Sequence, residues 1–321
     1  MVKHIRFLIA VVMLCFVTTA HAQDACDILS TLLDKVQAQV IDQGQYDRAL
    51  STLREMKNDR DFRGCSSGLN RLGNMLLMVE SFKSNPPMTF TVKGVSFTMI
   101  AVKGGAFWMG AEDGDKEVAD SDRPRHSVTL SDFYLGETEV TQALWEAVMG
   151  GNPSQFKGSA NPVEMVSWED CQEFVARLNA LTDGRRPAGR KFRLPTEAEW
   201  EYGARGGDKS KGHAYSGSDK LAEVAWYYGN SQNSTHPVKS KCANELGLYD
   251  MSGNVYEWCE DWYDSGYYRR SPSTNPCNTT EAACRVLRGG SWVSDAWHCR
   301  VAYRDACMPT CRFDGGLRLA L

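Results

Sequence analysis

The tripeptide Asn85-Pro86-Pro87 divides this chain into two segments whose hydrophobic residues follow different periods. Before it, over residues 24–84, apolar residues recur every three or four positions, which predicts three helices. After it, short alternating strands are expected at residues 90–92 and 96–100, on either side of Lys93-Gly94. Because proline interrupts regular structure, we interpret the tripeptide as a domain boundary.

The second segment is expected to contain few helices, since it is rich in glycine, tryptophan and loops. Residues 142–149 and 169–181 have helical spacing, and a shorter helix is expected to begin at Thr196. Thr196 and Glu199 have the spacing of a capping box. Because a loop-rich fold needs large aromatic residues in its interior, we interpret six tryptophans as core residues: Trp145, Trp168, Trp200, Trp226, Trp258 and Trp292.

The first 22 residues have the pattern of a secretory signal peptide. Basic residues precede an apolar run over residues 7–20, which ends at Ala20-His21-Ala22. The mature protein is therefore expected to begin at Gln23 and to be secreted or periplasmic. Lipidation is not expected, because Cys26 lies four residues past Ala22. The rest of the chain has no uninterrupted apolar stretch of about 18 residues, so no membrane span is expected.

Export places the cysteines in an oxidising environment, where disulfides form. The chain has 11 cysteines, and removal of Cys15 with the signal peptide would leave an even number. Cys26 and Cys65 flank the predicted helices of residues 23–87, so a bridge between them would stabilise a small helical region. The alternative is that this pair is unlinked. The further disulfide candidates are Cys277, Cys284, Cys307 and Cys311.

The charge of the chain argues against nucleic acid and anionic lipid as partners. Charged residues make up 24% of the sequence, and the formal net charge is −4. A nucleic-acid-binding surface would require a cluster of basic residues. Proteins, glycans or small molecules are the expected partners.

Several strings in the second segment carry a family resemblance. They include GGAFWMG at residues 104–110, FRLPTEAEWE at 192–201, NELGLYDMSGNVYEW at 244–258 and RGGSW at 288–292. In this order they resemble the formylglycine-generating enzyme (sulfatase-modifying factor) family. The resemblance implies a mixed α+β fold with little regular secondary structure, related to C-type lectin domains. The expected organisation is a signal peptide (1–22), a helical region (23–87) and a formylglycine-generating-enzyme-like domain (88–321).

The resemblance also points to a missing catalytic group. Family members with oxidase activity carry cysteines three and eight residues after the serine of the Gly-Gly-Ser string, and here these positions are Ser294 and Cys299. Two thiolates can hold Cu(I), whereas a serine hydroxyl is a poor ligand for it. Copper binding is therefore not expected. Cys299 is the only catalytic candidate, and its alternative interpretation is a buried or disulfide-bonded cysteine.

Other chemistries have little support in the sequence. Iron enzymes of the wider superfamily use clustered histidines, but His126, His213, His236 and His298 are scattered singly. The chain also lacks a nucleophile elbow, a Walker loop and a dinucleotide-binding glycine motif.

A calcium site is implied by the resemblance in residues 250–257. The family binds calcium there through a side chain, two backbone carbonyls and a glutamate, at positions that match Asp250, Gly253, Val255 and Glu257. Oxygen ligands from a loop suit Ca²⁺. The alternative is a tight turn with nearby carboxylates and no ion.

Residues 293–314 combine family-matched anchors with an irregular set of other residues, and we expect them to form a ligand-binding face. Lectin-like proteins diversified by retroelements vary the corresponding segment. The expected contact residues are of types common in interface hot spots, namely Trp297, His298, Tyr303, Met308 and Phe313. They could instead fill the core. Cys307 and Cys311, which the family pattern lacks, are a candidate for a small disulfide loop.

Two functional hypotheses follow. The first is an exported, non-catalytic, calcium-stabilised module that binds a protein or glycan ligand at the cell surface. The second is an enzyme, such as a sulfatase-maturation-type oxidase that uses Cys299 with another cysteine.

Overall fold

The computed structural model describes residues 86–112 and 118–321. The chain divides into two units, Met1–Glu80 and Ser81–Leu321, and the described residues belong to the second. The expected signal peptide, the helical region up to residue 85 and the Cys26–Cys65 bridge lie outside the described residues.

The described fold begins with a three-stranded antiparallel sheet in the order β1-β2-β5. Strands β1 (Met88–Val92) and β2 (Val95–Val102) form a hairpin, and β5 (Phe133–Gly136) pairs with the other edge of β2. Lys93 and Gly94 both have positive φ (47° and 84°), as two-residue hairpin turns that match the strand twist require. This confirms the expected pair of strands.

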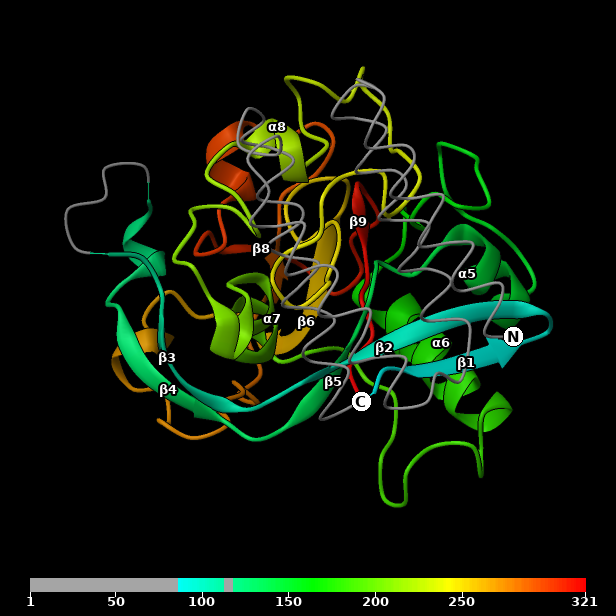
Figure 1. Cartoon of the computed structure of the whole chain (residues 1–321), viewed down its shortest axis with the longest axis horizontal. Helices are drawn as coiled ribbons and strands as arrows, with labels where there is room; N and C mark the ends of the chain where they lie inside the picture. The colour runs from blue at the N-terminus through cyan, green and yellow to red at the C-terminus, as the bar shows by residue number, and fades with distance from the viewer. Residues whose placement is uncertain (1–85, 113–117) are drawn as a thin grey trace, which may run out of the picture. The chain divides into compact units, whose positions relative to one another are not determined.

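Two further sheets complete the strand framework. Strands β3 (Gly105–Met109) and β4 (His126–Leu130) form an antiparallel pair. The C-terminal sheet has the order β8-β7-β6-β9, and its strands are β6 (Tyr256–Trp262), β7 (Arg285–Arg288), β8 (Asp305–Cys307) and β9 (Gly315–Gly316). Figure 1 shows β6 and β9 side by side in the middle of the domain, where they pair in parallel.

The three expected helices are present, and each begins after a capping residue, of which only Thr196 was expected. Helix α5 (Gln142–Met149) is capped by Thr141, α6 (Trp168–Leu181) by Ser167, and α7 (Glu197–Ala204) by Thr196. A reciprocal bond between Thr196 and Glu199 forms the expected capping box. A short helix α8 (Leu221–Val224) was not expected. Four 3₁₀ turns lie in the connections of the described chain: η2 (Asp120–Asp122), η3 (Gly207–Lys209), η4 (Tyr267–Arg269) and η5 (Ala296–Cys299).

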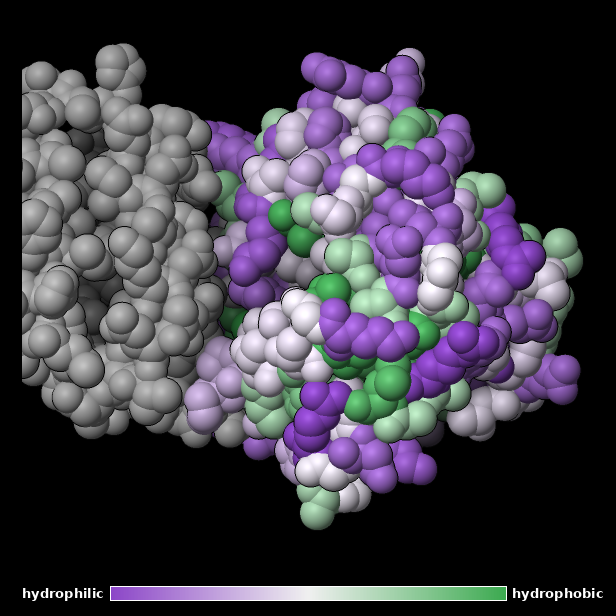
Figure 2. All heavy atoms as spheres, turned by 90° about the vertical axis from the view of Figure 1, so that its right-hand side faces the viewer, coloured by the Kyte–Doolittle hydropathy of each residue, from purple (hydrophilic) through white to green (hydrophobic). Residues whose placement is uncertain are grey.

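Two large hydrophobic clusters form the core. One joins the hairpin β1–β2 to α5, α6 and β6, and the other joins α7 to β3, β4 and β6. Trp145, Trp200 and Trp258 are buried as expected, whereas the other three expected core tryptophans are half-buried. Figure 2 shows the side of the domain that lies to the right in Figure 1, near α5, α6 and the hairpin. There, hydrophobic residues gather in small groups among hydrophilic ones.

Buried ion pairs connect α7 to the C-terminal sheet. Arg304 forms two bonds with Glu197, at 2.6 and 2.9 Å, and Arg288 donates to Glu201 at 2.6 Å. All four side chains are almost completely buried. Since a buried charge without its partner is costly, these pairs hold the segments in one arrangement. No helix in the described part of the chain is long and apolar enough to cross a membrane.

Candidate functional site

The loop that precedes β6 is held in a tight turn. Asp250, Gly253 and Asn254 all have positive φ, at 57°, 77° and 67°. A Cβ atom at Gly253 would lie 2.2 Å from the backbone oxygen of Trp226, so only glycine fits there. The next amide, that of Asn254, donates to the same oxygen at 2.7 Å. Asp250, Gly253 and Val255 therefore lie in a tightly packed loop, and the fourth expected calcium residue, Glu257, lies on β6.

The two expected carboxylate ligands have different surroundings. Asp250 accepts a bond from the backbone amide of Lys239 at 2.8 Å through Oδ2, while its buried Oδ1 has no hydrogen-bond partner. Burial raises the pKa of Asp250 to about 6. Glu257 is bound by the Trp200 indole at 2.7 Å and by the Arg318 guanidinium at 2.7 Å. Asp250 therefore has a free oxygen for a cation, whereas Glu257 is already bound on both oxygens.

A third carboxylate, Glu139, belongs to the same interior region. It accepts bonds from the side chain of Asn254 at 2.7 Å and from the amide of Val255 at 3.0 Å. Burial, and then the charges of Asp250 and Glu257, raise the pKa of Glu139 well above its ordinary value. The sequence motif contained Glu139 but gave it no role, because these contacts span more than a hundred positions.

The four expected ligand residues meet part of what a calcium ion requires. Within residues 86–112 and 118–321, no three His, Cys, Asp or Glu side chains converge in a way that could hold a metal. The expected set does not require this, since two of its four ligands are backbone carbonyls. The unpartnered Asp250 Oδ1 and the excess of buried negative charge both suit a divalent cation.

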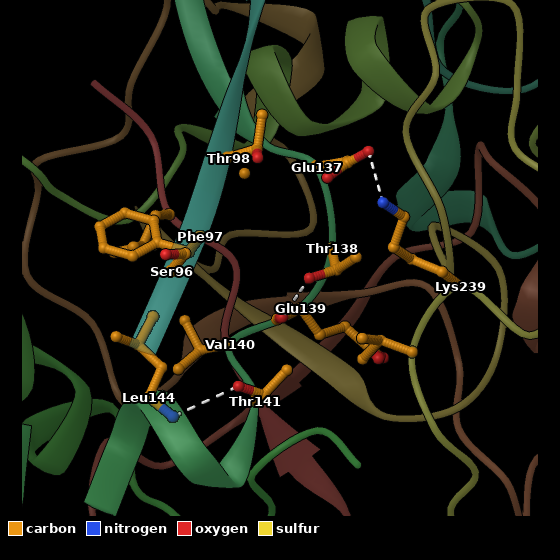
Figure 3. Close-up of a pocket in the computed structure, with 13 residues that line it drawn as sticks. Ser96, Phe97, Thr98, Glu137, Thr138, Glu139, Val140, Thr141, Leu144 and Lys239 are labelled. Carbon is orange, nitrogen blue, oxygen red and sulfur yellow. Dashed lines mark hydrogen bonds and ion pairs between the residues drawn. The ribbon is translucent and has the colours of Figure 1, made fainter. Parts of the chain in front are cut away.

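A pocket of about 270 Å³ lies beside this region, between β2 and the segment that follows β5. Figure 3 shows Glu137 and Lys239 pointing toward each other at one side of it, with Thr98 on the strand opposite. The Lys239 ammonium is 2.7 Å from Glu137 Oε1. The charge of the polar residues that line the pocket is therefore partly neutralised by the ion pair between Lys239 and Glu137.

Cys299 is a completely buried thiol in η5. Burial, and to a lesser extent Asp295, raise its pKa to about 12, so it is protonated at neutral pH. Ser294, at the position of the missing cysteine, accepts a bond from the Ser291 amide at 3.0 Å. Among the described residues, Cys299 forms no disulfide. This environment is unlike that of a reactive cysteine, which is partly exposed and near positive charge.

The other cysteines divide into one pair and several free thiols. Cys307 and Cys311 form a disulfide with Cα atoms 6.4 Å apart, which closes the expected small loop. The structure does not pair Cys277 with Cys284, and each is a free thiol that lies partly exposed.

The five expected ligand-contact residues have unequal exposure. Trp297 and Met308 are 40% and 57% exposed. His298 and Phe313 are half-buried, and Tyr303 is only 8% exposed. The rings of Trp297 and His298 both pack edge-on against Tyr303, with centroids 5.0 Å apart. Tyr303 therefore supports the face from below, which corrects the expectation that all five residues lie on the surface.

Phe313 has a similar supporting role. Its ring packs edge-on against buried Trp258, with centroids 5.9 Å apart, and also contacts Tyr256. We use the name binding face for the exposed part of the segment that was expected to bind a ligand, namely Val293, Trp297 and Met308 together with half-buried His298.

Two acidic residues of the expected segment 293–314 were given no role of their own from the sequence. Asp305 lies at the start of β8, and Asp314 precedes β9. Ser291 donates a hydrogen bond to Asp314. Burial raises the pKa of Asp314, and the negative charge of Asp305 raises it further. The hydrogen bond from Ser291 and the nearby His298 lower it by less, so the pKa is raised overall. Their separation in sequence gave no sign that they lie close together.

Known proteins share this loop-rich α+β architecture. The solved structure of Treponema denticola variable protein 1 superposes with a TM-score of 0.63 and 36% identity, covering 73% of this chain and 98% of that protein. The structure of PvdO from Pseudomonas aeruginosa superposes with a TM-score of 0.61 and 28% identity, covering 73% and 97%.

Curated sequences agree with the structural comparison. A chaperone protein LppX from Paenibacillus barcinonensis is 36% identical, over 65% of this chain and 83% of its own length. A formylglycine-generating enzyme from Streptomyces coelicolor is 32% identical, over 65% and 84%. Residues 87–321 match the family described as the sulfatase-modifying factor enzyme 1-like domain. The chain belongs to this family, as its sequence motifs indicated.

Proposed function

We propose that this protein is an exported, non-catalytic binding module of its family, which holds a protein or glycan ligand at the binding face. The observation that carries the proposal is the exposure of Trp297 and Met308 on a rigid frame. Large exposed aromatic and thioether side chains are typical of interface hot spots. The names of two relatives, a chaperone protein and a variable protein, are consistent with binding on this scaffold.

The test is to replace Trp297 and Met308 by alanine and measure binding to a library of cell-surface proteins and glycans. Trp108→Ala is the matched control, because Trp108 is 57% exposed on β3, outside the binding face. We expect the first two variants to lose a ligand that the control retains, with little change in melting temperature. Unchanged ligand binding in both variants would contradict the proposal, as would a loss of stability typical of core truncation.

The absence of oxidase chemistry is part of the same proposal. Ser294 replaces one cysteine of the family's copper-binding pair, and buried Cys299 has a raised pKa. With copper supplied, the protein should not convert a Cys-x-Pro-x-Arg peptide to formylglycine, as measured by mass spectrometry. Detection of formylglycine would instead support the alternative function, an enzyme that uses Cys299.

We further propose that calcium binds at Asp250, Gly253, Val255 and Glu257 and stabilises the domain. The unpartnered Oδ1 of Asp250 supports this. Calcium should raise the free energy of unfolding by about 2.7 kcal/mol when its free concentration is 100 times the dissociation constant. Asp250→Asn should abolish this increase, whereas Asp183→Asn, at a highly exposed position after α6, should retain it. If a chelator leaves the wild-type melting temperature unchanged, the loop is a turn without an ion.

Export rests on the pattern of residues 1–22. The intact mass of the protein recovered from its producing cells should correspond to a chain that begins at Gln23. A mass that includes residues 1–22 would refute this part of the proposal.

A further inference from the structure

The binding face lies beside carboxylates that lack a cationic partner. Asp305 and Asp314 are both partly exposed, and neither forms a salt bridge within the described part of the chain. Two arginines close to them in sequence are already paired. Arg304 is buried against Glu197, and Arg312 is held by Asp170 at 2.7 Å. Neither Arg304 nor Arg312 therefore pairs with Asp305 or Asp314.

The structure brings these carboxylates close to the aromatic residues of the binding face. Asp305 lies close enough to the Tyr256 and Tyr303 side chains to raise the pKa of both, after the larger effect of burial, and the Tyr303 ring packs against Trp297. On the other side, His298 lies close enough to Asp314 to influence it electrostatically. The Nδ1 atom of His298 is buried without a hydrogen-bond partner. Aromatic rings beside carboxylates favour a cation, which the ring faces and the negative charges both attract.

We propose that the ligand of the binding face is a protein that inserts an arginine or lysine side chain between the exposed Trp297 ring and the carboxylates of Asp305 and Asp314. This inference rests on the proposed binding function and specifies its partner. The aliphatic part of the inserted side chain packs on Trp297 and Met308, while its charged end reaches the carboxylates. Charge complementarity selects a basic partner over an acidic or neutral one, because a like charge at this position is repelled.

The repulsion between the two carboxylates supports the same conclusion. Burial contributes most to the raised pKa of Asp314, and the charge of Asp305 adds to it. A cation that neutralises both groups would remove this cost, as it does wherever like charges share a site.

The experiment uses the full chain and the peptide Ac-Gly-Arg-Gly-amide, with the citrulline peptide as its neutral isostere. Binding is followed by NMR of the labelled Met308 methyl group, assigned by its loss in Met308→Leu. We expect the arginine peptide to bind at least about tenfold more tightly than the citrulline peptide. Asp305→Asn and Asp314→Asn should each weaken arginine-peptide binding about tenfold, whereas Asp183→Asn, at an exposed position after α6, should not.

Three results would overturn the inference: no binding of the arginine peptide, equal binding of the two peptides, or unchanged affinity in both Asn variants. Each variant is first compared with wild type by thermal unfolding, so that loss of folding is not read as loss of binding. The arginine peptide could fail to bind while Trp297→Ala still loses a ligand found in the library of cell-surface proteins and glycans. In that case this inference fails and the proposed function stands.

Discussion

The backbone at Gly253 has φ 77°, and a Cβ atom there would meet the Trp226 carbonyl oxygen at 2.2 Å. Gly94 has a similar φ of 84°, but a Cβ atom there would meet no other atom within 4 Å. The two positions therefore have similar positive φ angles and differ in packing, which makes them a matched pair.

Gly94→Ala should lower the free energy of unfolding by about 1 kcal/mol, the cost of the left-handed conformation. Gly253→Ala should lower it by about 3 kcal/mol or more, because the new methyl group also displaces the Trp226 backbone. Urea unfolding of both variants measures the difference. Equal losses would show that the turn before β6 relaxes without cost.

Single residues also show the limits of sequence reasoning. The family resemblance implied Asp250 and Glu257 as ligands of one site, and the structure buries both side chains, Asp250 in the loop before β6 and Glu257 on β6. The resemblance gave no indication that Glu139 forms a hydrogen bond with Asn254, or that Ser291 forms one with Asp314. Contacts of this kind join distant positions, and local periodicity carries no information about them.

At the level of elements, the ion pairs between α7 and the C-terminal segment offer a sharp comparison. Arg304→Leu would leave Glu197 partly unpaired in the interior, so we expect a loss of about 3 to 5 kcal/mol. Arg312→Leu removes an ion pair with Asp170 in which the arginine is 58% exposed, and should cost at most about 1 kcal/mol.

Chemical denaturation of the two arginine variants provides the measurement. A small loss in Arg304→Leu would mean that Arg288, which also contacts Glu197 at 3.3 Å, is sufficient to compensate its charge.

The helices and the first hairpin were predictable because their signals are local. Thr196 and Glu199 marked the start of α7, and Lys93-Gly94 marked the hairpin turn. The C-terminal sheet was not predictable in the same way. Its strand β9 has only two residues, and it pairs with β6 about sixty positions earlier in the chain.

For the whole domain, buried carboxylates determine the response to pH. Burial raises the pKa of most shifted carboxyl groups, and it raises that of Asp261 to about 7. The other groups with a raised pKa are Asp122, Glu139, Glu164, Glu245, Asp250, Glu260 and Asp314. Asp170, Glu201, Asp219 and Asp264 are shifted downward.

A carboxyl group with a raised pKa binds a proton in the folded state at pH values where the unfolded chain has lost it. Stability therefore falls as pH rises from the ordinary aspartate range through about 7. In the presence of a chelator, the free energy of unfolding should be larger near pH 5 than near pH 8. Urea titrations at both values test this. A larger value at pH 8 would contradict the prediction, because the four lowered groups are ionised in both the folded and the unfolded state above about pH 5 and add little to this difference.

Along the chain, the residues of the binding face alternate with arginines that are buried in the interior of the domain. Arg288, Arg304 and Arg318 are buried in ion pairs, whereas Val293, Trp297 and Met308, which lie between Arg288 and Arg318 in the sequence, are exposed. In the proposed function, ligand recognition and folding therefore depend on different positions of one short segment. A combinatorial library confined to the outward positions would vary specificity while leaving the scaffold intact, so this segment is suited to rapid diversification of what the protein recognises.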